Sequence, residues 1–126
     1  MTTWIAVLLG GALGSVARHG VNVVTARMVG APSPWATAAV NMTGSIAIGL
    51  LAGALAANRL SMSRPMQTFV FVGILGGFTT FSSFMLDSLT LIQIGVPMKG
   101  ALNLVGQLVL GLSLTYAGYY VGLRAL

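Results

Sequence analysis

Apolar residues fill most of this chain in four long stretches, and short runs of turn-forming or basic residues separate one stretch from the next. A transmembrane helix needs about 20 predominantly apolar residues, and each stretch meets that length. The pattern therefore predicts a single all-α integral membrane domain over residues 1–126, without a linker or a separate soluble part. The predicted spans are about residues 4–28, 35–57, 66–94 and 98–123.

The amino end of the first span bears on whether that span stays in the mature protein. It reads Met-Thr-Thr-Trp and carries no basic side chain. A cleavable signal sequence normally begins with a positively charged region. We therefore expect the first span to be retained as a membrane helix.

The third span contains a block that a plain membrane helix does not need. Residues 73–84 read Gly-Ile-Leu-Gly-Gly-Phe-Thr-Thr-Phe-Ser-Ser-Phe. The adjacent Gly76 and Gly77 weaken a helix, and the four hydroxyl side chains that follow can bond main-chain groups that a broken helix releases. Irregular backbone at membrane depth is stable only where protein or a water-filled cavity surrounds it. The third helix is therefore predicted to break near its middle, in the working part of the chain.

Polar and small residues also recur every four positions on the three other predicted helices, which places them on one face of each. The three stripes are Gly10, Gly14, Arg18 and Asn22; Thr37, Asn41, Ser45, Gly49 and Gly53; and Asn103, Gln107, Gly111 and Thr115. One such stripe alone is more typical of close helix packing, in which small residues let backbones approach and polar side chains bond across the interface. Three stripes together with a broken helix favour a polar permeation path.

Composition supports the membrane assignment and argues against other classes of protein. Of the 126 residues, 56% are hydrophobic and 6% are charged, and the mean hydropathy is +0.95. The six basic residues are scattered between apolar stretches, so nucleic acid is not an expected partner. The sequence shows no nucleotide-binding loop, catalytic triad or paired-carboxylate site, and we do not expect an enzyme.

The basic residues are divided almost evenly between the two sides of the membrane. The side that carries both termini holds Arg59, Arg64 and Arg124; the other side holds Arg27 and Lys99, with Arg18 near the same end. An excess of Lys and Arg in cytoplasmic loops normally sets orientation. The near balance has two interpretations: a weak signal that other features support, or insertion in both orientations followed by pairing as an antiparallel homodimer. Four short helices are few to enclose a polar path, which also favours a dimer.

Four side chains are individual candidates for the path. A cation such as Arg18 costs about 2.5–3.5 kcal/mol to place within a span. It either reaches out to the membrane interface or faces a vestibule, where it would raise the local concentration of anions. Phe81 and Phe84 share a helix face and either pack in the core or offer their electropositive ring edges to an anion. Asp87, the single acidic residue, is expected to pair with a cation such as Arg18 rather than to carry protons.

Three motifs together resemble the CrcB/Fluc family of fluoride channels over essentially the whole chain. They are Gly11-x-x-Gly14-x-x-x-Arg18, Trp35-x-Thr37-x-x-Val40-Asn41-x-x-Gly44 and, most specific of the three, the block at residues 73–84. The resemblance implies a fluoride-selective ion channel that exports fluoride passively and lowers cytoplasmic fluoride. It implies a multi-pass protein of the cell inner (plasma) membrane, in contact with lipid. It also implies a dual-topology homodimer with two antiparallel pores.

The same resemblance implies roles for individual residues. A structural sodium ion, Na⁺, would be held by the main-chain carbonyls of Gly76 and Thr79 from both subunits. The anion-binding residues of the pore would be Phe81, Phe84, Asn41, Thr37, Ser82, Thr115 and Arg18. Two positions depart from the usual family pattern: His19 stands where tryptophan is common, and Gly111 stands where many members have serine. The second departure leaves open which residues of the fourth helix line the pore.

Two other functions stay open on the residues alone. A small dual-topology drug exporter driven by protons would need a carboxylate within the membrane, and Asp87 is its single candidate. A membrane subunit that transports nothing would use the glycine stripes for assembly only. It would leave the hydroxyl-rich block of the third span unexplained.

Overall fold

The chain folds into helices over the four apolar stretches. The computed structural model describes residues 1–30 and 33–125. Within that part, the elements are α1 (Thr2–Val29), α2 (Pro34–Ala56), α3 (Arg64–Gln67), the π-helix η1 (Thr68–Leu75), α4 (Gly76–Phe78), α5 (Phe81–Gln93) and α6 (Pro97–Ala125). The described residues contain four helical segments long and apolar enough to cross a membrane, and the third, over Arg64–Gln93, is broken within. The predicted four-helix membrane fold with a broken third helix is confirmed.

Local signals in the sequence set the amino ends of two helices. Ser33 precedes α2, and its hydroxyl accepts a hydrogen bond from the Trp35 N–H at 3.3 Å, while Pro34 occupies the first turn. Ser63 caps α3 in the same way, ahead of Pro65. Serine at the cap with proline just after it is a common helix start, because proline lacks an N–H that would go unpaired there.

Glycines follow the carboxyl ends of two helices. Gly30 follows α1 and Gly95 follows α5, with φ angles of 78° and 86°. Glycine adopts this left-handed conformation without the strain that a Cβ atom would add. Ala31 and Pro32, between the first two predicted spans, lie outside the described residues.

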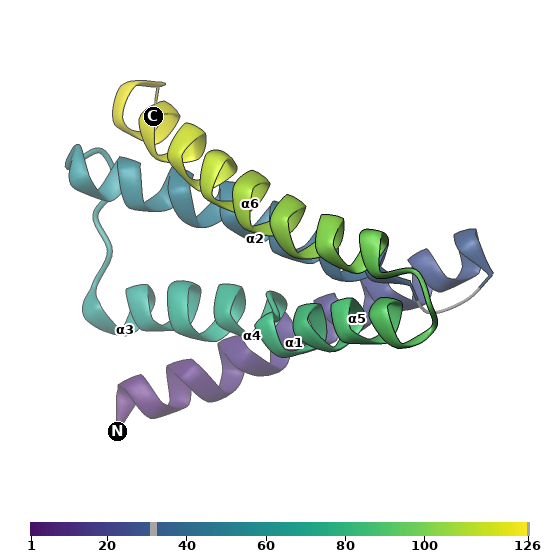
Figure 1. Cartoon of the computed structure of the whole chain (residues 1–126). Helices are drawn as coiled ribbons and strands as arrows, with labels where there is room; N and C mark the ends of the chain where they lie inside the picture. Colours follow the sequence, from purple (N-terminus) through teal and green to yellow (C-terminus); the bar gives the residue numbers. More distant parts are fainter. Residues whose placement is uncertain (31–32, 126) are drawn as a thin grey trace.

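The helices pack in two pairs, and glycines bring each pair together. α1 lies along η1 and α4, whereas α2 lies along α6 (Figure 1). A Cβ on Gly10 would come within 2.5 Å of the Phe69 carbonyl oxygen, and a Cβ on Gly49 would overlap the Thr115 carbonyl. Small residues at such crossings let the two backbones approach closely. The glycines of the predicted stripes therefore serve helix packing.

The π-helix is a feature that the hydrophobic pattern did not predict. Over Thr68–Leu75 the backbone is wound more widely than in an α-helix, and the Gly76 N–H that follows bonds the Phe71 carbonyl, five residues back. π-helical turns are rare and occur frequently at functional sites. Here the π-helix directly precedes α4 and the break in the third helix.

The ends of the helices place the basic residues at two ends of the molecule. Both termini and the connection from α2 to α3 lie at one end, and the connections from α1 to α2 and from α5 to α6 lie at the other (Figure 1). At the first end, Nη1 of Arg59 donates a hydrogen bond to the Arg124 carbonyl at 2.8 Å. Arg27, in the last turn of α1, and Lys99, in the first turn of α6, lie at the second end.

Candidate functional site

The third helix breaks at Thr79 and Thr80, just after the paired glycines. Both threonines have extended backbone, with φ and ψ of −79° and 161° at Thr79 and −152° and 117° at Thr80. Gly76 and Gly77 remain helical within α4, so the break lies beyond the glycines themselves. The Thr80 hydroxyl then accepts a hydrogen bond from the Ser83 N–H at 3.2 Å and caps α5. A threonine able to start a new helix therefore fixes where the old one ends.

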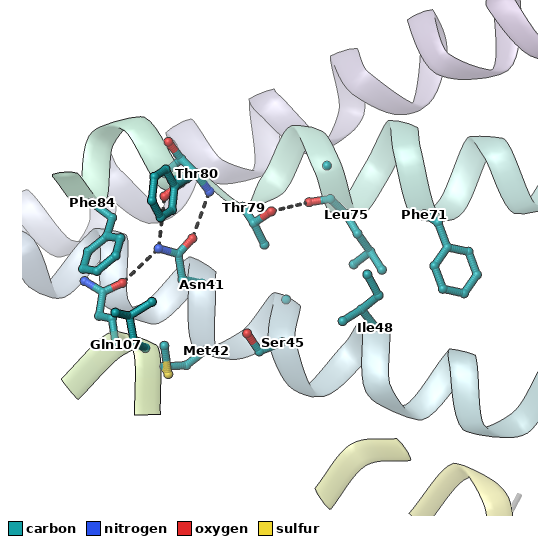
Figure 2. A pocket seen from close by; sticks show the side chains of 14 residues that line it. Asn41, Met42, Ser45, Ile48, Phe71, Leu75, Thr79, Thr80, Phe84 and Gln107 are labelled. Carbon is teal, nitrogen blue, oxygen red and sulfur yellow. Dashed lines mark hydrogen bonds between the residues drawn. The ribbon is translucent and has the colours of Figure 1, made fainter. Parts of the chain in front are cut away.

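Asn41 of α2 replaces helical hydrogen bonds at the break. Its Oδ1 accepts from the Thr80 N–H at 2.9 Å, and its Nδ2 donates to the Thr80 carbonyl at 3.1 Å (Figure 2). In an unbroken α-helix the Thr80 N–H would bond the Gly76 carbonyl. The Gly76 carbonyl is therefore released from its usual helical partner.

Arg18 of α1 points inward at the same break. Its Nη1 donates to the Thr79 carbonyl at 3.3 Å. The N–H and the hydroxyl of Thr79 both donate to the Leu75 carbonyl, at 3.0 and 2.9 Å. Arg18 therefore contacts the broken segment of the third helix, and its role beside a vestibule stays a prediction.

Asp87 differs from its predicted pairing. The Thr37 hydroxyl of α2 donates to Asp87 Oδ2, and Thr37 is buried. The partner of the carboxyl group is therefore a neutral hydroxyl, and the expectation of a cation such as Arg18 is corrected. The reason is the position of the helices: α5 packs on α2 and α6, whereas Arg18 comes from α1 and reaches only the break.

Phe81 and Phe84 contact each other but have different surroundings. Their ring centroids lie 5.8 Å apart, with the ring planes at 73°, so one ring edge meets the other face. Phe84 is 3% exposed, whereas Phe81 is 67% exposed on the surface of the single chain. The nearby Ser82 is exposed, and its Oγ lies 3.4 Å from the Thr80 Oγ1.

Five predicted site residues meet in one groove beside the break, which we term the break groove. Its volume is about 330 Å³, and its walls come from α2, the third helix and α6 (Figure 2). The predicted residues that line it are Asn41, Gly76, Thr79, Phe81 and Phe84.

The structure places the other predicted residues outside the walls of the break groove. Arg18 and Ser82 contact two of its wall residues, Thr79 and Thr80, whereas Thr37 bonds Asp87, which does not line the groove. The Thr115 hydroxyl bonds the Gly111 carbonyl of its own helix at 2.9 Å, in the contact between α2 and α6. A pore role for Thr115 stays a prediction.

Comparison with known proteins gives the family. A model of the family described as CrcB-like protein, Camphor Resistance (CrcB), matches residues 5–119. The chain belongs to the CrcB-like family. It is 45% identical to the fluoride-specific ion channel FluC of Agrobacterium fabrum over 92% of each chain, and 40% identical to that of Hyphomonas neptunium over 98% of each. It is 43% identical to the FluC of Thermus thermophilus over 97% of this chain and 96% of the relative.

The main-chain oxygens at the break fit the sodium ion that the resemblance to CrcB/Fluc channels implies. Carbonyl groups freed where a membrane helix unwinds are suitable ligands for Na⁺. The Gly76 carbonyl has lost its helical partner to Asn41, and the Thr79 carbonyl already attracts a cationic group, the Arg18 guanidinium. The Thr79 hydroxyl donates to the Leu75 carbonyl and therefore does not pair the carbonyl of Gly76 or of Thr79. The Gly76 oxygen has thus lost its helical partner, whereas Arg18 bonds the Thr79 oxygen in the single chain, and a sodium site at the break stays a prediction.

Gln107, in the wall of the break groove, was predicted only as a member of the polar stripe on the fourth helix. Gln107 of α6 is 8% exposed, and its Oε1 accepts a hydrogen bond from Asn41 Nδ2 at 2.9 Å. The four-residue spacing of Asn103 and Gln107 was the available signal. A stripe on one helix does not reveal which residue of another helix it meets, so the bond between Gln107 and Asn41 could not be predicted.

Proposed function

We propose that the chain is a fluoride-selective ion channel of the cell inner membrane, and that two antiparallel copies form two pores. The observation that carries this proposal is the identity of 40–45% with proteins named fluoride-specific ion channel FluC, over more than nine-tenths of the chain. In this function the protein lets fluoride move down its gradient and catalyses no chemical reaction.

The size of the break groove supports a second copy. Its volume of about 330 Å³ is far larger than the ~10–15 Å³ that a cavity needs to hold one water molecule. A groove this wide cannot distinguish one small anion from another by contact on all sides. Phe81 is exposed at its edge and is free to pack against another chain. A partner that narrows the groove would complete the path, and antiparallel pairing would produce it twice.

The chemistry of the break suits an anion that must bind and leave quickly. Asn41 and the hydroxyls of Thr80 and Ser82 lie close to the Phe81 and Phe84 rings, and an anion would exchange with the protein acceptors that the Asn41 and Thr80 donors bond in the single chain. Ring edges are electropositive, so they attract an anion without holding it as strongly as a cation would. Conduction requires binding of this weak, repeated kind.

The proposed sodium ion is structural. The Gly76 and Thr79 carbonyls of the two subunits would hold it, and when bound it would supply a fixed positive charge near the anion path. The Thr79 carbonyl would have to accept both the ion and Arg18, or exchange one for the other, because Arg18 bonds this oxygen in the single chain.

A flux experiment tests the proposed function directly. The purified protein is placed in liposomes loaded with potassium fluoride or potassium chloride, and anion release is followed with ion-selective electrodes after a potassium ionophore is added. We expect rapid fluoride release and chloride release close to that of protein-free liposomes. Equal release of both anions would contradict selectivity, and no fluoride release would contradict the channel itself.

A further inference from the structure

Both N–H donors of the Asn41 amide are already engaged. A side-chain amide carries two N–H donors and one carbonyl oxygen. The Asn41 Nδ2 donates to the Thr80 carbonyl at 3.1 Å and to the Gln107 Oε1 at 2.9 Å, and its Oδ1 accepts from the Thr80 N–H. An anion that uses Asn41 must therefore displace one of these two acceptors.

The bond to Gln107 is the easier one to exchange. The Thr80 main chain is held at two points by Asn41, in place of the bonds that the break removes. Releasing a main-chain carbonyl in the membrane interior is strongly unfavourable, since no water is there to replace the bond. The Gln107 oxygen is at the end of a side chain, and rotation of its terminal bonds can withdraw it.

The orientation of the Gln107 amide follows from its neighbours. The Ser88 hydroxyl donates to the Phe84 carbonyl at 2.9 Å, so its oxygen is left to accept from Asn103 Nδ2 at 2.8 Å. The Asn103 Oδ1 then accepts from Gln107 Nε2 at 3.0 Å. This leaves the Gln107 Oε1, an acceptor, facing Asn41. The Asn41 amide must therefore present an Nδ2 donor to it.

Burial makes this chain of hydrogen bonds persistent. Gln107 is 8% exposed and Ser88 is 1% exposed. Hydrogen bonds in a low-dielectric interior are stronger than in water, and members of a chain polarise one another. The resting position of the Gln107 oxygen is therefore well defined, and it lies directly on the donor that an anion would use (Figure 2).

We infer that Gln107 is a positioning residue that competes with fluoride for the Asn41 amide. The inference rests on the proposed function, because it requires the anion path to pass Asn41. Gln107 keeps the N–H paired when no anion is present and takes it back as the anion leaves. Its effect is to weaken fluoride binding and speed release, and rapid conduction requires both.

The test separates affinity from rate. Fluoride flux is measured over a range of fluoride concentrations for the wild type, for Gln107→Met and for Leu112→Met. Methionine is unbranched and of similar length but offers no comparable acceptor, and Leu112 is 75% exposed on the same helix, so it serves as the matched control. For Gln107→Met we expect a half-saturating concentration about 3–10-fold lower, the range of one net hydrogen bond, together with a lower maximum flux. The control should match the wild type.

A second variant covers the case in which Gln107→Met does not fold. Asn103→Leu keeps Gln107 but removes the group that orients its amide, so the half-saturating concentration should again fall, by a smaller factor. A folded variant with lower flux and unchanged half-saturation would show that Gln107 is merely structural and would overturn the inference.

The two proposals fail in different ways. A wild type that releases no fluoride contradicts the channel, and the inference about Gln107 falls with it. A wild type that conducts fluoride, with both variants indistinguishable from it in half-saturation, contradicts the inference alone.

Discussion

Two phenylalanines three positions apart on one helix differ in burial because their surroundings differ. The sequence places Phe81 and Phe84 on one face of α5, and the structure confirms that their rings touch. Phe84 is enclosed by α2 and α6, whereas Phe81 projects from the single chain. Spacing along one helix predicts the contact, but burial depends on what the other helices, and a second chain, bring to it.

This difference predicts distinct effects of substitution. Phe84→Ala should destabilise the protein by about 3–5 kcal/mol, because it leaves a cavity in a packed interior. Phe81→Ile should reduce fluoride flux severely while the unfolding temperature of the folded chain stays near that of the wild type. Thermal unfolding in detergent and liposome flux measure the two quantities. Unchanged flux in Phe81→Ile would show that this ring serves packing and does not contact the anion.

Asn41 is predicted to matter for stability as well as for flux. Asn41→Ala removes the groups that pair the Thr80 N–H and carbonyl, and each unpaired buried group costs about 1–3 kcal/mol. Asn41→Asp can still accept from the Thr80 N–H, but its carboxylate cannot donate to the Thr80 carbonyl and would repel an anion. We expect a lower unfolding temperature for both variants and the greater loss of flux for Asn41→Asp. A fully stable Asn41→Ala would show that another group replaces the amide at the break.

At the scale of helices, the sequence predicts which helices form better than it predicts where a helix breaks. Hydrophobic length gave the four spans, because membrane thickness sets it, and the run of residues 73–84 gave a broken third helix. The break nevertheless falls at Thr79 and Thr80, since Thr80 caps α5 and Asn41 bonds it from α2. The Thr80 cap belongs to the third span, but the contact from Asn41 of α2 that also holds the break is contained in no pattern of that span.

The glycines of α2 give a prediction about helix packing. Gly49→Ala should lower stability by about 1–3 kcal/mol, the usual effect of overpacking, because a methyl group there overlaps the Thr115 carbonyl of α6. Gly20→Ala is the matched control, since no atom lies within 4 Å of a Cβ at that position. Thermal unfolding of the two variants in detergent provides the comparison. Equal stability would mean that α2 and α6 move apart at no cost.

The break in the third helix also predicts a dependence on sodium. Replacing sodium by N-methyl-D-glucamine during purification should lower the unfolding temperature and favour dissociation of the proposed dimer, because a ligand at 100 times its Kd stabilises by about 2.7 kcal/mol. Gly76→Leu should abolish this dependence. In the single chain a Cβ on Gly76 meets only the Phe71 carbonyl, at 3.6 Å, so the substitution would act at the ion or the partner. Stability independent of sodium in the wild type would contradict the site.

At the scale of the whole molecule, the sequence could not show what completes the break groove. Asn41, Gly76, Thr79, Phe81 and Phe84 were predicted together and line one groove. The contact of Gln107 with Asn41 and the contact of Thr37 with Asp87 were not predicted, because both depend on how α2, α5 and α6 meet. The family resemblance indicated a second copy, and the width of the groove is a physical reason to expect one.

Orientation in the membrane is a prediction about the molecule as a whole. The near balance of basic residues at its two ends should let the chain insert both ways. The natural sequence has no cysteine, so Ser61→Cys, in the exposed connection after α2, introduces a single thiol. We expect labelling of this thiol from both sides of the membrane. Several lysines added at one terminus should trap one orientation and abolish activity when that variant is expressed alone. Labelling of the wild-type background from one side only would contradict dual insertion.

The π-helix before the break has a consequence for chain length. Each turn of η1 closes over five residues where an α-helix closes over four, so the segment contains a residue that α-helical geometry would not need. Deleting one residue within Thr68–Leu75 would let the ladder close in α-helical rings while α3 and α4 keep their places beside α1. The same deletion within α5 would turn every later side chain by about 100°, since one turn takes 3.6 residues. The effect of deleting one residue should therefore differ sharply on the two sides of the break. Before the break, the π-helix can shorten to an α-helix and keep the fold. Beyond the break, the deletion would rotate the side chains that follow it away from their present contacts.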